Sequence, residues 1–139
     1  MDVTLFAFLI GIVVVGVLLI IVIAVTKKGP APLDIDKYRS RWLAIESSLA
    51  RDNEPSYHLA VLNADKLLDQ ALKERRIKGA TMGERMKTLK TTWSNANAVW
   101  SAHKLRNQIA HESDARVSYD DARRALGGFK QALKDIGAI

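Results

Sequence analysis

The sequence predicts an all-α protein, with one N-terminal transmembrane helix followed by an antiparallel bundle of four to five helices. A long uncharged apolar run at the start of the chain indicates the transmembrane helix. In the rest of the chain, apolar residues recur at spacings of three and four, which places them on one face of a helix. No stretch shows the alternation typical of a half-buried strand. The connections between helical segments are short, which favours antiparallel neighbours.

The predicted domain organisation is an anchor over residues 1–27, a linker over 28–33 and a helical domain over 34–139. The apolar run, residues 3–25, carries no charge and spans about 34 Å as a helix, enough to cross a bilayer core of about 30 Å. A cleaved signal peptide is the alternative, but it would have positive charge before its apolar core. Here Asp2 precedes the run and Lys27 and Lys28 follow it, which favours an anchor.

The same lysines predict the orientation, because positive charge beside a span favours the cytoplasmic side. We therefore expect a single-pass protein of the cell membrane with its C-terminal domain in the cytoplasm. The linker contains Gly29, Pro30 and Pro32, and both prolines oppose helix formation. Because the linker is short, the domain is expected to lie close to the membrane.

The composition restricts the chemistry open to the chain. Its 21 basic and 15 acidic residues give a net charge of +6, which permits an anionic partner such as RNA or lipid headgroups. The absence of cysteine excludes disulfides and thiolate catalysis. No zinc-ligand set, phosphate-binding glycine loop or Ser/His/Asp triad occurs, so neither a cofactor nor a metal site is predicted.

Local signals predict where the helices of the domain begin and end. Helices are expected to begin at Asp34, at Pro55, at Thr81 in a Thr-x-x-Glu capping box, near Ala96, and at Ser118. The first is expected to continue to about Asp52, the second to about Ile77 with Gly79 as its stop, and the fourth to His111. Trp93 and Trp100 are interpreted as core residues. Gly127 and Gly128, in the last helix, predict a weak point or the close approach of another helix.

Two carboxylates of the second helix of the domain, Asp65 and Asp69, lie one turn apart. That spacing suits a shared proton or a metal ion. A solvated helix edge, with Asp69 paired to Lys73, explains the same pattern and is the favoured interpretation.

The stretch from His103 to Glu112 concentrates the residues able to do chemistry. Arg106 can hold a phosphate through its fork of donors, and His111 can move a proton near neutral pH. Five residues correspond to about 140° around a helix, so the two side chains do not share a face. They could converge through the reach of Arg106, through fraying of the helix at His111, or from two chains. A surface arginine and a capping histidine would show the same spacing.

The pair Arg106-Asn107 followed by Ala110-His111 resembles the Arg-Asn-x-x-x-His signature of the HEPN superfamily of helical-bundle domains. The resemblance covers roughly residues 34–138. The run 57–77 resembles the long early helix of that family, and 79–87, with Thr81 and Glu84, resembles the turn after it.

This resemblance implies a HEPN-like bundle and a metal-independent ribonuclease that acts as a homodimer. Arg106 would hold the scissile phosphate, His111 would act as general acid or base, and Asn107 would orient them. A non-catalytic RNA- or protein-binding module remains open, with Arg106 and His111 tying the bundle together. A scaffold that recruits a dimer to the membrane remains open too. His103 is interpreted as filling a core edge, with assistance to the site as the alternative.

Overall fold

The computed structural model describes residues 2–26 and 29–139, and the regular structure in these residues is entirely α-helical. The all-α prediction is therefore confirmed for this part of the chain. The chain divides into two units, Met1–Ala31 and Pro32–Ile139. In chain order the helices are α1 (Val3–Thr26), α2 (Ile35–Ser48), α3 (Glu54–Glu74), α4 (Met82–Thr88), α5 (Ala96–His111) and α6 (Tyr119–Asp135).

Helix α1 makes up most of the first unit and buries none of its residues. The most apolar stretch within its 24 residues has a mean hydropathy of 3.5, so by length and composition α1 is compatible with a membrane span. A signal sequence near the N-terminus meets the same two criteria. The charges on Lys27 and Lys28, on which the predicted orientation depends, lie outside the described residues.

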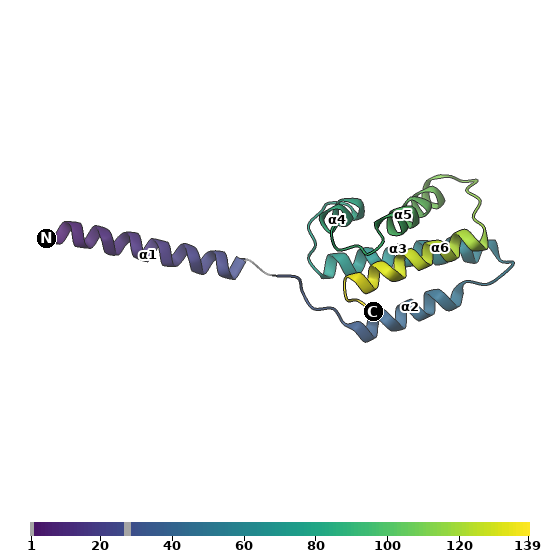
Figure 1. Cartoon of the computed structure of the whole chain (residues 1–139), viewed down its shortest axis with the longest axis horizontal. Coiled ribbons are helices and arrows are strands. Elements are labelled where there is room, and N and C mark those ends of the chain that lie inside the picture. The colour runs from purple at the N-terminus through teal and green to yellow at the C-terminus, as the bar shows by residue number, and fades with distance from the viewer. Residues whose placement is uncertain (1, 27–28) are drawn as a thin grey trace. The chain divides into compact units, whose positions relative to one another are not determined.

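Helices α2–α6 form the second unit, with α3 at its centre (Figure 1). Helix α3 packs against α2, α4, α5 and α6, and α5 also packs against α6. Helix α2 lies on one side of the α3–α6 pair, and α4 and α5 lie on the other. So central a position requires a broad apolar surface. The buried apolar residues of α3 are Tyr57, Ala60, Val61, Ala64, Leu67, Leu68, Ala71 and Leu72.

The hydrophobic core lies entirely within the second unit. Its largest side chains with almost no exposure include Tyr38 of α2, Leu68 of α3, Met86 of α4 and Phe129 of α6. A unit with its own core is expected to fold without α1. Leu59 of α3 lies outside this core, with 55 % of its side chain exposed.

The helices of the second unit begin where the capping signals predict. Asp34 accepts a hydrogen bond from the backbone N–H of Lys37 at 3.1 Å, and Pro55 lies in the first turn of α3. At α6, Ser118 accepts a bond from the N–H of Asp121 while the Asp121 carboxylate accepts one from the N–H of Ser118. These side chains satisfy backbone donors that a helix start leaves unpaired.

The predicted helix ends are less accurate. Helix α2 ends at Ser48 rather than near Asp52, and α3 ends at Glu74 rather than at Ile77. The stop of α3 is not Gly79 but Arg76, which adopts a left-handed conformation with φ of 60°. The backbone N–H groups of Arg76 and Ile77 then bond back to the carbonyls of Lys73 and Leu72, which closes the last turn.

The two neighbouring glycines of α6 differ in what surrounds them. A Cβ placed on Gly128 would lie 2.7 Å from the carbonyl oxygen of Ala98 in α5, whereas a Cβ on Gly127 would meet nothing within 4 Å. The predicted close approach of a second helix is therefore confirmed at Gly128, and it brings α5 against α6.

Two tryptophans lie at the start of α5: Trp93 just before the helix and Trp100 within it. Trp93 is buried, as predicted, and its indole N–H donates a 3.0 Å hydrogen bond to the carbonyl of Met86. Trp100 is half-buried and packs against the core. These contacts fix α5, which carries the Arg-Asn-x-x-x-His motif.

Candidate functional site

The motif residues of α5 divide between two places in the structure. Arg106 and Asn107 line a pocket of about 740 Å³ between α3, the start of α4 and α5. His103, one turn earlier, lines the same pocket, because residues three and four apart share a helix face. His111 is the last residue of α5; it is exposed and lies outside this pocket. Within one chain the fold thus brings Arg106 together with His103 and Asn107 but not with His111.

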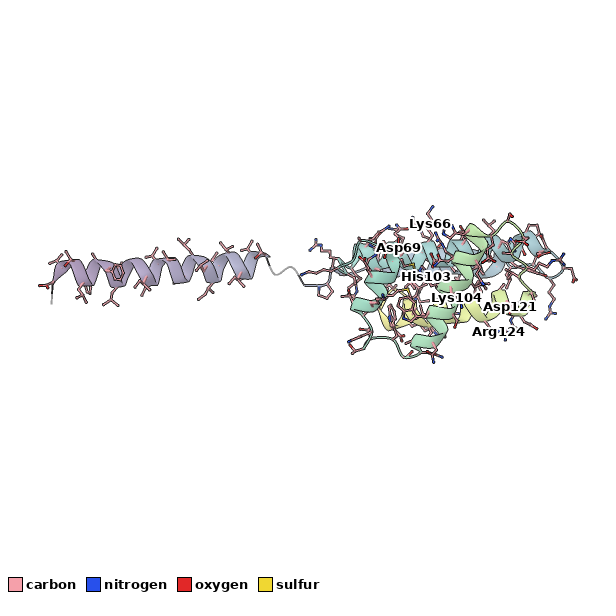
Figure 2. The ribbon with its side chains drawn as sticks, turned by 90° about the horizontal axis from the view of Figure 1, so that it is seen from above. Lys66, Asp69, His103, Lys104, Asp121 and Arg124 are labelled. Carbon is pink, nitrogen blue, oxygen red and sulfur yellow. The ribbon has the colours of Figure 1, made fainter. Side chains whose placement is uncertain are left out.

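Helix α3 supplies the opposite wall of this α3–α5 pocket. Its residues there include Asn63, Asp65, Lys66 and Asp69. Figure 2 labels Lys66 and Asp69 on α3 and His103 on α5. The start of α4 closes the pocket with Thr81, Met82 and Gly83, none of which is charged.

Asp65 joins the two walls of the pocket. It is 3 % exposed, and its Oδ1 lies 2.7 Å from Nδ1 of His103. Its Oδ2 lies 3.2 Å from Nε of Arg106. This second contact is an ion pair rather than a hydrogen bond, because the buried Nε–H is not directed at an acceptor. The prediction that Asp65 lies on a solvated edge is therefore wrong, since α5 covers that side of α3.

Arg106 retains donors for a ligand after these contacts. Its side chain is 35 % exposed, and one terminal nitrogen donates a 3.0 Å hydrogen bond to the amide oxygen of Asn107. A guanidinium carries five N–H donors in a planar fork, and this arrangement engages only part of that fork. Asn107 therefore orients Arg106 through a hydrogen bond between neighbouring residues.

Asp69 ties α3 to α4 at the edge of the pocket. Its carboxylate lies 2.7 Å from Nζ of Lys73, as predicted from their spacing, and also accepts two hydrogen bonds from Arg85, at 3.1 and 2.5 Å. Arg85 is 6 % exposed and donates a third bond to the carbonyl of Gly79. Burial alone would raise the pKa of Asp69, but hydrogen bonds from Lys73 and Arg85 outweigh it and hold that pKa below its ordinary value.

A second pocket, of about 620 Å³, lies between α5 and α6. The charged residues that line it, within the described chain, are Asp121 and Arg124, labelled in Figure 2, and they pair with each other. Hydrogen bonds from Ser118 and then Arg124 lower the pKa of Asp121, which caps α6. Both charges already serve the structure of α6, so the α3–α5 pocket is the stronger candidate.

The sequence did not predict the pairings between residues that are distant in the chain, and it did not indicate Arg85 at all. His103 and Asp65 are 38 positions apart, and Arg85 and Asp69 are 16 apart. One weak signal was present: Asp65 falls between Ala64 and Leu67 on the apolar side of α3, where a carboxylate needs a partner. Within residues 2–26 and 29–139 there is no group of three or more His, Cys, Asp or Glu side chains placed to hold a metal ion.

Comparison of the chain with protein-family models, with curated proteins and with solved structures gave no match. The HEPN resemblance therefore stays a prediction based on the motif residues themselves.

Proposed function

We propose that this chain is a membrane-anchored HEPN-like protein whose helical unit binds RNA at the α3–α5 pocket and cleaves it without a metal ion. The observation that carries the proposal is the placing of Arg106 and Asn107 in one pocket, with the guanidinium partly exposed and oriented by the amide. An arginine in this setting can grip the non-bridging oxygens of a phosphodiester.

The electrostatics of the pocket support an anionic ligand. Its two carboxylates are already engaged: Asp65 faces Arg106 and His103, and Asp69 faces Lys73 and Arg85. Lys66 lines the pocket and forms no ion pair within the described residues. Among the lining residues, Lys66 and Arg106 balance the charges of Asp65 and Asp69, and both carboxylates are already paired, so a ligand phosphate would not face a free carboxylate.

The motif resemblance implies a site that two chains could share. His111 is exposed at the end of α5, and a second copy of the chain could present this histidine to Arg106. The predicted homodimer, with its domain on the cytoplasmic side of the cell membrane, belongs to this proposal.

A non-catalytic binding module is the second candidate, and one contact favours it. The ion pair between Arg106 and the buried Asp65 connects α5 to α3. In this view Arg106 stabilises the bundle, and its loss would leave Asp65 with one partner fewer.

A matched pair of variants separates the two candidates. Arg106→Ala and Lys104→Ala each remove one positive charge from α5, but only Arg106 lines the pocket; Lys104 is exposed. Cleavage of single-stranded RNA by residues 32–139 would be measured in the presence of a chelator, alongside thermal unfolding. We expect Arg106→Ala to lower the rate about 10²- to 10³-fold and Lys104→Ala to leave it near that of the wild type.

Two results would contradict the ribonuclease proposal. One is a wild-type protein that binds RNA without cutting it. The other is cleavage that survives Arg106→Ala while the melting temperature falls, which would assign Arg106 a structural role alone.

A further inference from the structure

We infer that His103, oriented by Asp65, is the group that transfers a proton beside Arg106 within the same chain. This inference rests on the proposed ribonuclease function and names the acid–base residue of its site. It differs from the assignment implied by the motif, in which His111 has that role.

The first observation is that one buried carboxylate holds both groups. His103 meets Oδ1 of Asp65 through Nδ1 at 2.7 Å, and Arg106 meets Oδ2 through Nε at 3.2 Å. Because the two oxygens belong to a single carboxylate that is 3 % exposed, imidazole and guanidinium are held next to each other. A phosphate on the free edge of Arg106 would therefore lie beside the His103 ring.

The second observation concerns the tautomer of the His103 imidazole that Asp65 favours. A carboxylate accepts hydrogen bonds, so Nδ1 of His103 donates and Nε2 is the nitrogen left to exchange a proton. No residue in the described chain bonds to Nε2. The ring also makes an edge contact with Trp100, with centroids 6.2 Å apart, and its side chain is 13 % exposed where it lines the pocket. These contacts fix the ring while leaving one nitrogen available.

The third observation is the helical register. His103 precedes Arg106 by three residues and shares its face, whereas His111 follows by five and points about 140° away. The other charged groups around the ring are Lys66 and Asp69 on α3, and α4 adds none to the pocket wall. His103 is thus the one imidazole that lines this pocket in the described chain.

The reaction that this geometry supports is an internal transphosphorylation. Nε2 of His103 takes the proton from a ribose 2′-hydroxyl, and the freed 2′-oxygen attacks phosphorus. The bond from phosphorus to the 5′-oxygen breaks, and that oxygen takes a proton from water. The hydroxide that remains takes the proton from Nε2 of His103, which restores the neutral imidazole. The products are a 2′,3′-cyclic phosphate and a 5′-hydroxyl end, while Arg106 neutralises charge on the non-bridging oxygens. DNA has no 2′-hydroxyl, so it would not be cut.

The test compares His103→Gln with His111→Gln in residues 32–139, with RNA and a chelator. We expect His103→Gln to lower kcat about 10²- to 10⁴-fold, with little change in KM, and to remove one limb of the pH–rate profile. His111→Gln should retain the wild-type profile. Loss of that limb in His111→Gln instead would assign the proton transfer to the motif histidine and overturn the inference. Circular dichroism of each variant would establish that the helices are intact.

Asp65 acts as a positioning residue, and its test uses a readout that a structural role would not move. Asp65→Asn should shift the limb of the pH–rate profile that His103→Gln removes. Asp65→Glu, which keeps the carboxylate, should restore part of kcat.

A mixing experiment tests whether the site lies within one chain. Equal amounts of Arg106→Ala and His103→Gln protein should remain inactive together, because neither chain holds a complete site. Recovery of cleavage in the mixture would overturn the single-chain assignment, as would a His103→Gln protein that cuts at the wild-type rate. In both cases the wild type is active, whereas failure of the proposed function itself would show as an inactive wild type.

Discussion

The packing of α5 against α6 can be tested at two adjacent positions that differ in one respect. Gly127 and Gly128 both lie inside α6, so replacing either with alanine gives the same gain in helix propensity, about 1 kcal/mol. Gly127 is exposed, and a Cβ there meets nothing within 4 Å. Gly127→Ala should therefore stabilise the domain by about 1 kcal/mol.

At Gly128 the same methyl group would meet backbone. The added Cβ would lie 2.7 Å from the carbonyl oxygen of Ala98 and 2.9 Å from its carbonyl carbon. These atoms belong to α5 and cannot rotate away as the end of a side chain can, so α5 and α6 must separate. Overpacking of this kind costs about 1–3 kcal/mol. After the propensity gain, Gly128→Ala should be destabilised by about 0–2 kcal/mol.

The difference between the two variants isolates the contact, because the propensity term cancels. We expect Gly128→Ala to be less stable than Gly127→Ala by about 1–3 kcal/mol, or roughly 4–12 °C in melting temperature for a domain of this size. The assay is thermal and urea unfolding of residues 32–139, followed by circular dichroism at 222 nm. Equal stability of the two variants would refute the close approach, and with it the position of the helix that carries Arg106.

Two further predictions concern the left-handed residues after α3 and α6 and the ion pair between Asp69 and Arg85. Arg76→Gly should raise the free energy of unfolding by about 0.5–1 kcal/mol, because glycine adopts the φ of 60° at this helix end without steric cost. Gly137→Ala, at the equivalent position after α6, should lower it. Urea unfolding measures both variants, and a loss of stability in Arg76→Gly would contradict the strain argument. Asp69 has a lowered pKa in the folded state, so the stability it contributes is present above the ordinary pKa of an aspartate and is lost as the pH falls through the lowered value. Asp69→Asn should therefore lower the free energy of unfolding by about 3 kcal/mol at pH 7, because Arg85 loses a charged partner. The difference in stability from the wild type should narrow as unfolding is repeated down to pH 3. A difference that does not change with pH would exclude this role for Asp69.

The apolar segment able to span a membrane and the starts of the bundle helices follow from local sequence. An uncharged apolar run needs no tertiary information, because each of its residues individually favours an apolar environment. The caps at Asp34 and Ser118 are also local, since each side chain bonds to a backbone N–H three residues ahead. The glycine pair 127–128 is also a local signal, but it left open whether another helix approaches there and which of the two glycines it meets.

The end of α3 was predicted less well because its left-handed position is taken by an arginine rather than by a glycine. At α6 the position is taken by Gly137, with φ of 69°, and at α3 by Arg76. The penalty for a non-glycine residue there is about 1–2 kcal/mol, which the packing of Ile77 against the core can offset. A glycine signal at residue 79 therefore gave a helix that was too long.

The sequence by itself determined that the chain is helical, that it begins with a segment able to span a membrane, and that Arg106 and His111 stand on different faces of one helix. Only the tertiary structure decided which residues meet Arg106. Asp65 and His103 lie on α3 and α5, and no spacing along either helix indicates that the two face each other across a pocket. The reason is physical: periodicity along a helix reports which side of it is buried, whereas the pairing of two buried polar groups depends on how the helices are set against each other.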